Sequence, residues 1–301
     1  MKQYACNSIV IPVDFSETSL LAIRHAAFMA QYNKAKLCML HVINVNFGAL
    51  ELFVPVIDAE LMQSIEKKAQ QRLNELANEL ANEFQIEVTT ELRSGSASKH
   101  IVEYAKSINA DIIVMGTHGY SPFEELIIGS TALKVLVKSH CPVIAMRKHE
   151  THKGYSNILM PIDLSPHTAQ KARYTLELAK TYGAGVHILG LLHEDEHSKL
   201  PVLKTLIYEI EEIAKHLHVH THTFINTDVK NRAVSTVTYA KENNVDLICI
   251  MTDQDAELSG FFLGPYTQQI IHHSQVPVLA LKPKTFSSVN DSGFYSTAVG
   301  F

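Results

Sequence analysis

The segment IVIPVDFSETSLLAIRHAAFMAQ (residues 9–31) recurs in altered form as ILMPIDLSPHTAQKARYTLELAK (residues 158–180). Both copies begin with an apolar run that ends in Pro-x-Asp, and both continue through a serine into a helical pattern. Asp14 of the first copy corresponds in this register to Asp163 of the second. An internal repeat of this length indicates that the chain contains two copies of one structural unit.

A second match supports this division, but the offset between the paired residue numbers is different. The segment DIIVMGTHG (residues 111–119) corresponds to DLICIMTDQ (residues 246–254), so Asp111 is matched with Asp246. The stretch from Asp163 to Asp246 is shorter than the stretch from Asp14 to Asp111. The second copy is therefore shorter in its middle, and we place the difference around NFGALELFVPVIDAE, residues 46–60.

The boundary between the copies falls in KHETHKGYS (residues 148–156), a polar stretch with a glycine. The sequence therefore predicts one domain at residues 1–150 and a second at residues 151–283. Residues 284–301 are rich in Ser and Gly and show no clear period, so we expect a flexible tail.

Strand-like and helical patterns alternate along each copy. In the first copy we expect strands at about 8–13, 36–43, 86–92, 111–115 and 142–146, and helices at about 18–33, 58–83, 97–108 and 129–138. Apolar runs such as SIVIPV are typical of parallel strands covered on both faces. Each copy is therefore predicted to be a doubly wound α/β domain with a five-stranded parallel sheet of the Rossmann-like type. Ligands bind beyond the carboxyl ends of such strands, which places Asp14 and Gly116 at one edge.

Composition restricts the class of partner. The chain is 46% apolar and 19% charged, with a net charge of -5, so nothing favours nucleic acid or an anionic membrane as a partner. No apolar run is long enough to span a bilayer, and the N-terminus shows no signal peptide. The four cysteines are widely spaced without a CxxC motif, which favours free thiols in a reducing compartment. We therefore expect a soluble cytoplasmic protein.

A glycine-rich loop, MGTHGYSPFEELIIGST (residues 115–131), joins a predicted strand to a predicted helix. Such a loop can bind phosphate through backbone N–H groups and the positive end of the following helix. Glycine permits a close approach of the backbone to the ligand, and Ser130 is placed to cap the helix or to donate to a phosphate oxygen. Glycines at a strand–helix junction are also common in plain turns, so the spacing alone favours a structural turn.

The combined motifs resemble the universal stress protein family. The spacing GTHG, nine residues, then GS is similar to the nucleotide loop of that family, and IVIPVDFSETSLLAIRHA resembles its first strand and helix. LCMLHVI and CPVIAMRK resemble its second and fifth strands. The resemblance covers both repeats, so the chain is identified as a tandem member whose two adenine nucleotide alpha hydrolase-like domains form an intramolecular pseudo-dimer.

The resemblance implies a stress-response protein that binds ATP or AMP as a regulatory ligand, with Mg²⁺ as a possible companion of ATP. Asp14 would accept from the ribose hydroxyls or from adenine, although a strand-end Asp also commonly caps the next helix, a role that Ser16 or Thr18 can take instead. The implied binding residues are Pro12, Val13, Asp14, Val42, Met115, Gly116, His118, Gly119, Gly129, Ser130 and Thr131.

The second copy does not keep the loop. In the register that matches Asp111 with Asp246, Gly116 becomes Met251, Gly119 becomes Gln254 and Ser130 becomes Pro265, while Gly129 is kept as Gly264. Methionine and glutamine do not permit the same approach to phosphate, and proline removes a donor. We therefore expect a nucleotide in domain 1 only and a scaffold role for domain 2.

The loop favours binding over efficient hydrolysis. It has no P-loop lysine and no arrangement of base and nucleophile, so no catalytic residue is assigned. Two alternatives stay open. One is a scaffold that binds an unknown protein partner without nucleotide through the apolar segment at residues 46–60, and further homodimerisation of the chain is left open. The other is a weak Mg²⁺-dependent ATPase that uses Glu124 or Glu125.

A histidine-rich segment, KHLHVHTHTF (residues 215–224), forms part of the predicted third strand of the second copy. His220 and His222 alternate with Thr221, so they are expected on one face, and two such histidines can ligate zinc or copper if further ligands are present. His193 and His197 are candidate further ligands at an unknown distance, but a solvated face of an edge strand explains the pattern. We therefore predict no metal site.

Overall fold

The computed structural model describes residues 6–44, 59–117, 128–147, 154–165, 167–252 and 263–283. The first half, domain 1, comprises β1 (Ser8–Val13), α1 (Glu17–Asn33), β2 (Lys36–Ile43), α2 (Ala59–Phe84), β3 (Val88–Ser94), α3 (Ala97–Ser107), β4 (Ile112–Gly116), α4 (Ser130–Lys138) and β5 (Val143–Met146). The second half, domain 2, comprises β6 (Asn157–Ile162), α5 (Thr168–Tyr182), β7 (Gly185–Leu191), the short 3₁₀ helix η1 (Glu194–Lys199), α6 (Leu200–His216), β8 (Thr221–Asn226), α7 (Arg232–Glu242), β9 (Leu247–Met251), α8 (Pro265–His273) and β10 (Val278–Leu281).

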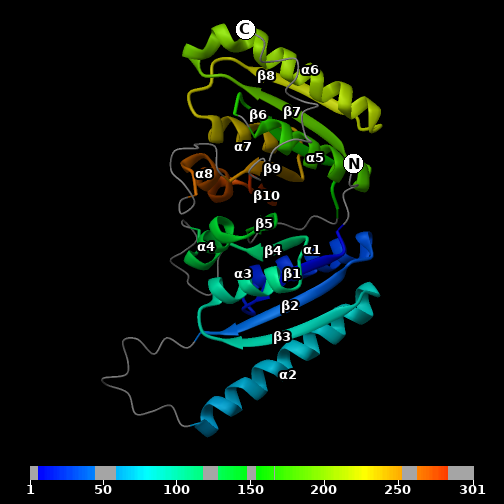
Figure 1. Cartoon of the computed structure of the whole chain (residues 1–301), viewed down its shortest axis with the longest axis vertical. Helices are drawn as coiled ribbons and strands as arrows, with labels where there is room; N and C mark the ends of the chain where they lie inside the picture. Colours follow the sequence, from blue (N-terminus) through cyan, green and yellow to red (C-terminus); the bar gives the residue numbers. More distant parts are fainter. Residues whose placement is uncertain are drawn as a thin grey trace, which may run out of the picture.

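The strands form one continuous sheet in the order β3-β2-β1-β4-β5-β10-β9-β6-β7-β8 (Figure 1). Within each domain all strand pairs are parallel, and the order reverses between β1 and β4 in domain 1 and between β6 and β9 in domain 2. The predicted doubly wound α/β architecture is therefore confirmed in both copies. The strands and helices expected for the first copy all form, with ends that differ by no more than two residues.

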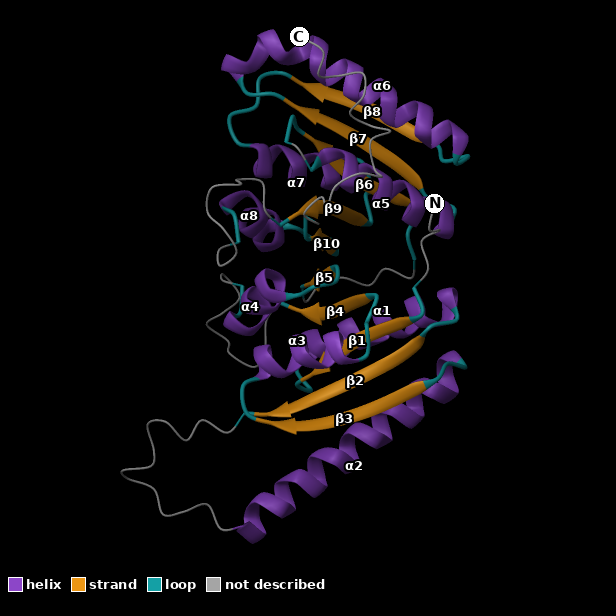
Figure 2. Cartoon of the chain, viewed as in Figure 1, coloured by secondary structure: helices purple, strands orange, loops and turns teal. Residues whose placement is uncertain are grey.

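Helices cover both faces of the sheet (Figure 2). The buried residues of α1, α2, α5 and α6 belong to one apolar cluster, and those of α3, α4, α7 and α8 belong to a second cluster on the opposite face. Because both faces are covered, strand residues such as Ile9, Val10 and Ile11 are all fully buried. This explains why the strand sequences are apolar throughout instead of alternating.

The two domains are joined through the only antiparallel pairing among the described strands. β5 and β10 lie side by side with Val278 opposite Ala145 and Ala280 opposite Val143. Every residue of both strands is buried. The pairing merges two five-stranded sheets into one, so the expected intramolecular pseudo-dimer is observed.

A reciprocal pair of cations stabilises this joint. Lys282, directly after β10, donates to the carbonyl oxygen of Val137 in the last turn of α4, with 3.0 Å between Nζ and O. Arg147, directly after β5, donates to the carbonyl oxygen of His272 in the last turn of α8. Lys282 and Arg147 are equivalent positions of the repeat. Each domain therefore caps the C-terminal end of a helix in the other, where the helix dipole favours positive charge.

The opposite face of the joint is closed by the ends of α1 and α5. The rings of Tyr32 and Tyr182 stack with centroids 4.5 Å apart, and Asn33 Nδ2 donates to the Tyr182 hydroxyl at 2.7 Å. His25 Nε2 lies 2.7 Å from the hydroxyl of Tyr155, which precedes β6. Contacts on both faces thus hold the domains in one orientation.

The expected edge strand forms, but it contains only the last four residues of the histidine-rich segment, so His222 lies within β8 and His220 lies before it. β8 begins at Thr221, and His222 lies opposite His187 of β7, whereas Thr89 holds this position in domain 1 opposite Cys38. In the register that matches Asp111 with Asp246, His222 would correspond to Glu87, so the observed strand is displaced by two positions from that register. Where the chain is described, no group of three or more His, Cys, Asp or Glu side chains is arranged to hold a metal ion.

Some sequence predictions concern residues outside the described part of the chain. They include the predicted tail at 284–301, nearly all of the segment at 46–60, and residues 118–127 of the glycine-rich loop. Across the described residues, the apolar length needed to span a bilayer is not reached by any helix.

The reciprocal capping predicts that Lys282→Met destabilises the protein. The variant loses a charged hydrogen bond at the domain joint while keeping most of the apolar length of the side chain, and we expect a loss of about 1 kcal/mol in the free energy of unfolding. Urea unfolding followed by circular dichroism measures this loss. Lys67→Met, at an exposed position of α2, is the control and should change stability by less than about 0.5 kcal/mol. Equal effects of the two variants would contradict the capping role of Lys282.

Candidate functional site

The carboxyl ends of β1 and β4 lie next to each other at one edge of domain 1. The two strands pair in parallel, with Ile9 opposite Ile112. This adjacency brings Asp14, just after β1, to the edge where β4 ends at Gly116. The strand order reverses at this place, which is where open α/β sheets bind ligands.

Asp14 is exposed and is not the cap of α1. The cap is Ser16, whose hydroxyl accepts a hydrogen bond from the Ser19 backbone N–H at 3.2 Å. Oδ1 of Asp14 accepts from the backbone N–H of Ser16 at 2.9 Å, which orients the carboxylate at the start of the turn. Because Ser16 caps the helix, the charge of Asp14 is not needed for that purpose.

Gly116 is required by packing. A Cβ atom at this position would lie 2.9 Å from Cγ2 of Thr18 and 3.3 Å from the Thr18 carbonyl carbon in the first turn of α1. The end of β4 therefore approaches the start of α1 more closely than a side chain would allow. Met115 precedes it and is buried in the apolar cluster of the α3 and α4 face.

Gly129 is the N-cap residue of α4 and provides no side-chain cap. Its N–H donates to the carbonyl oxygen of Thr117 at 2.8 Å, and a Cβ atom would lie 3.0 Å from the same oxygen. Ser130 and Thr131 are the first residues of the helix, and the first intrahelical bond runs from Leu133 N–H to Gly129. The N–H groups of the first turn therefore present the positive end of α4 at this edge of the sheet.

The remaining predicted residues divide into two groups. Val42 lies near the end of β2, opposite Arg93 of β3, and Pro12 and Val13 end β1. His118 and Gly119 fall outside the described residues, as do Glu124 and Glu125. The structure thus brings together the ends of β1, β2 and β4 and the start of α4.

Sequence reasoning missed a stack of side chains beside Asp14. Phe15 has a φ of 63°, in the left-handed region, and its ring lies 5.0 Å from that of His41. Nδ1 of His41 lies 2.6 Å from the carbonyl oxygen of Val13. The guanidinium of Arg72, from α2, lies 4.4 Å from the Phe15 ring centroid. No sequence signal connects Arg72 with the strand end, because a charged residue in the helical pattern of α2 is typical of a solvated helix face.

The corresponding aspartate of domain 2 has a different environment. Asp163 is 8% exposed, and its Oδ1 accepts from the Ser165 N–H and the Thr168 hydroxyl, both at 3.2 Å. Lys171 on α5, at the position of Ala22 in α1, is 1% exposed and packs in the core beneath it. Asp163 is therefore buried among internal partners, whereas Asp14 faces solvent.

The charges around Asp163 lower the pKa of its carboxyl. Burial alone would raise the pKa of this carboxyl, but the Lys171 ammonium, the hydrogen bonds from Ser165 and the nearby Arg232 together hold the pKa below its usual value. Burial lowers the pKa of Lys171, and the Asp163 carboxylate opposes this change. Since each charge compensates the other in a buried environment, removing one leaves its partner uncompensated.

The glycine loop of domain 2 has also changed at both ends. Met251 ends β9 at the position of Gly116, and Pro265 is the first residue of α8 at the position of Ser130. Proline offers no N–H. At Gly264 a Cβ atom would lie 3.8 Å from the Thr252 carbonyl oxygen, an ordinary contact distance, so the close approach found at Gly129 is absent here.

The buried pair predicts unequal effects of the same substitution in the two domains. Asp163→Asn keeps the oxygen that accepts from Ser165 and removes the charge facing Lys171, so we expect a loss of at least about 3 kcal/mol in the free energy of unfolding. Asp14→Asn at the exposed equivalent position should cost less than about 0.5 kcal/mol. Urea unfolding compares them, and adding Lys171→Met to Asp163→Asn should restore most of the loss. Equal costs of the two Asn variants would show that Asp163 and Lys171 are not coupled.

Glu196 of η1 predicts a pH effect on stability. A hydrogen bond from the His193 N–H, with further contributions from Lys199 and Arg232, lowers its pKa from 4.5 to about 2. A carboxyl with a lowered pKa stabilises the fold fully above the unfolded-state value and loses this contribution as pH falls towards the folded-state value. Glu196→Gln should therefore lower the melting temperature at pH 6 and have a smaller effect near pH 2. A difference between variant and parent that stays constant across this range would contradict the assignment.

Comparison with known proteins agrees with a chain built from two copies of one α/β domain. The model of the universal stress protein family matches residues 6–147 and 154–282. A universal stress protein of Methanocaldococcus jannaschii is 34% identical over 147 residues, which cover 46% of this chain and 81% of that protein. Universal stress protein A homolog 1 of Coxiella burnetii is 34% identical over 141 residues, covering 46% of this chain and 94% of that protein.

A solved structure extends over both domains. The crystal structure of a universal stress protein from Archaeoglobus fulgidus has a TM-score of 0.73 and 21% identity, and the likeness covers 93% of this chain and 99% of that one. At this identity the likeness concerns the fold. Since the family model matches both halves separately, the chain belongs to the universal stress protein family and carries two of its domains in tandem.

Proposed function

We propose that domain 1 binds an adenine nucleotide, ATP or AMP, as a regulatory ligand, and that domain 2 contributes no second nucleotide site of this kind. The ligand would lie at the edge formed by the ends of β1 and β4. Three features support this location: an exposed carboxylate after β1, a glycine at the end of β4, and an uncapped helix start at α4.

Each part of the nucleotide has a matching group. The carboxylate of Asp14 is suited to accept from the ribose hydroxyls. Pro12 and Val13 would line the base, and the backbone of Val42 would meet the adenine edge, at the ends of two adjacent strands. The N–H groups that begin α4, with the hydroxyls of Ser130 and Thr131, suit the phosphates, where His118, Gly119 and a Mg²⁺ ion would complete the site for ATP.

The observation that carries the proposal is the contrast between Asp14 and Asp163. The two occupy the same position of the repeat, but only Asp14 is exposed and free of a buried cation. A ribose hydroxyl would have to displace Asp163 from Lys171 and its hydroxyl partners, which would leave a buried charge uncompensated. Pro265 further removes a donor from the start of α8.

A regulatory role is supported by the connection of the proposed site to domain 2 through the shared sheet. The site lies at the edge of a sheet that is continuous with domain 2 through β5 and β10. No base and nucleophile are assigned at this edge, so binding is proposed as the function and the output would be a change in shape or in affinity for a protein partner.

Calorimetric titration of the full chain with ATP and with AMP tests the proposal. We expect about one nucleotide per chain. Asp14→Asn keeps the acceptor for the Ser16 N–H and removes the charge offered to the ribose, so the affinity should fall about tenfold, which corresponds to about 1.4 kcal/mol. Two sites per chain would show that domain 2 binds as well, and no binding would favour a scaffold that acts without nucleotide.

The duplicated glycines provide a matched pair of variants for the phosphate end. Gly129→Ala places a Cβ atom 3.0 Å from the Thr117 carbonyl and should displace the start of α4, whereas Gly264→Ala meets only an ordinary contact at 3.8 Å. Nucleotide affinity should fall with the first variant and remain unchanged with the second. Comparing phosphate release by the parent chain with that by Glu124→Gln and Glu125→Gln tests the ATPase alternative.

A further inference from the structure

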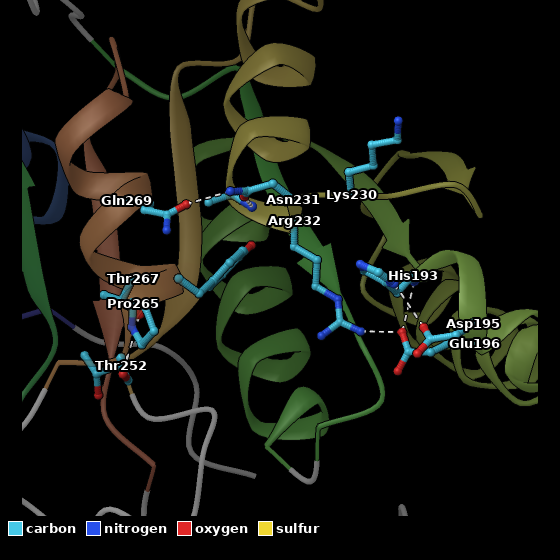
Figure 3. Close-up of a pocket in the computed structure, with 13 residues that line it drawn as sticks. His193, Asp195, Glu196, Lys230, Asn231, Arg232, Thr252, Pro265, Thr267 and Gln269 are labelled. Carbon is cyan, nitrogen blue, oxygen red and sulfur yellow. Dashed lines mark hydrogen bonds and ion pairs between the residues drawn. The ribbon is translucent and has the colours of Figure 1, made fainter.

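Domain 2 contains a polar pocket beyond the carboxyl ends of β7, β8 and β9 (Figure 3). Its volume is about 530 Å³, within the range of small-molecule sites. Three segments form its walls: the chain after β7 with His193 to Glu196, the turn into α7 with Lys230 to Ala233, and the start of α8 from Gly264. These segments are far apart in sequence and meet only because the parallel strands end at the same edge.

Arg232 lines the pocket (Figure 3), where it pairs with Glu196 and also lies near the carboxylate of Asp163. One terminal nitrogen pairs with Oε2 of Glu196. Glu196 also accepts from the His193 N–H at 2.9 Å and from Lys199 at 3.1 Å, so its charge is shared among several donors. Nε of Arg232 is buried without a hydrogen-bond partner among the described residues. The pair with Glu196 thus fixes the guanidinium at the pocket, where the Arg232 side chain remains 34% exposed.

The start of α8 adds a second source of positive potential. Gly264 is its N-cap residue and provides no side-chain cap, and the first intrahelical bond runs from Gln268 N–H to Gly264. Pro265 has no N–H, so the backbone donors left at this end are those of Tyr266 and Thr267. Lys230 stands in the turn before α7 and forms no ion pair with any described carboxylate. An oxyanion in the pocket would meet Arg232 and a helix start, with Lys230 adding charge at the rim.

These cations are absent from the corresponding part of domain 1. Arg232 begins α7 where Ala97 begins α3. The connection from the third strand to this helix is two residues longer in domain 2, because His222 of β8 takes the place of Thr89 while Arg232 takes that of Ala97. Lys230 lies in the lengthened turn. Domain 2 has therefore lost the backbone donor at Pro265 and has gained cationic side chains on the opposite wall.

The rest of the lining suits a ligand with many hydroxyl groups better than a nucleobase. Asn231 and Gln269 are joined by a hydrogen bond of 3.0 Å across one wall, and Asp195 lies near His193 on another. Apart from the Tyr266 ring, the apolar side chains of the lining are small, Ala233 and Pro265. Amides and carboxylates pair with hydroxyls, whereas a base would need a larger apolar surface.

We propose that this pocket binds a phosphorylated polyol, of the class of sugar monophosphates, as a second ligand of the chain. The phosphate group would lie between Arg232 and the start of α8, and the hydroxyl groups would contact Asn231, Gln269 and Asp195. The two domains then sense different classes of ligand within one continuous sheet.

Titration of the full chain with glucose 6-phosphate tests the proposal, with glucose, inorganic phosphate and AMP as comparison probes. We expect one site per chain for glucose 6-phosphate and at least tenfold weaker binding of glucose and of inorganic phosphate. Asp14→Asn should leave this binding unchanged, so failure here is distinguishable from failure of the nucleotide site. Equal binding of glucose 6-phosphate and inorganic phosphate, or no binding of either, would overturn the proposal.

Two substitutions at one position separate recognition from folding. Arg232→Gln removes the charge and should weaken glucose 6-phosphate binding at least tenfold. Arg232→Lys keeps a charge for Glu196 but loses the planar fork, so it should preserve the melting temperature and still weaken binding. Lys241→Gln, at the far end of α7, is the control and should bind as the parent does. Binding that is insensitive to both Arg232 variants, or AMP binding that depends on Arg232, would contradict the proposal.

Discussion

The antiparallel pairing of β5 with β10 is the contact on which the architecture of this chain depends. Each strand would otherwise be the exposed edge of a five-stranded sheet, with unpaired backbone groups and an apolar surface. Pairing them buries both and leaves β3 and β8 as the edges of a single ten-stranded sheet. The exchange of Arg147 and Lys282 between the helix ends, and the Tyr32–Tyr182 stack on the other face, then fix the orientation of the two domains.

Within this frame the two copies have diverged at the same edge of the sheet. In domain 1 the end of β1 carries an exposed Asp14 above Ala22, whereas domain 2 places Asp163 above the buried Lys171. A buried lysine is tolerated because the carboxylate is close, so these two positions depend on each other. The change removes the carboxylate from solvent, and Arg232 lines a polar pocket at this edge of domain 2.

The fold was predictable to a large extent because its signals are local. Apolar runs and helical periods along residues 8–146 place each strand and helix within two residues of its observed ends. The register of β8 was not predictable, because the two extra residues lie in a polar turn whose sequence does not resemble that of domain 1. The motifs predicted the places of Asp14 after β1 and of Gly129 before α4. The Phe15–Arg72 stack and the partners of Asp163 were missed, since they join segments far apart in the chain.

The sequence by itself determined the duplication, the class of fold and the loss of the glycine loop in the second copy. These follow from residue identity and spacing along the chain. Only the tertiary structure decided that Asp14 faces solvent while Asp163 is buried, that Gly116 is required by the first turn of α1, and that Arg232 and Glu196 meet in a pocket. Burial and electrostatic pairing depend on distances between segments that are remote in sequence, and packing of the helices on both faces of the sheet determines those distances.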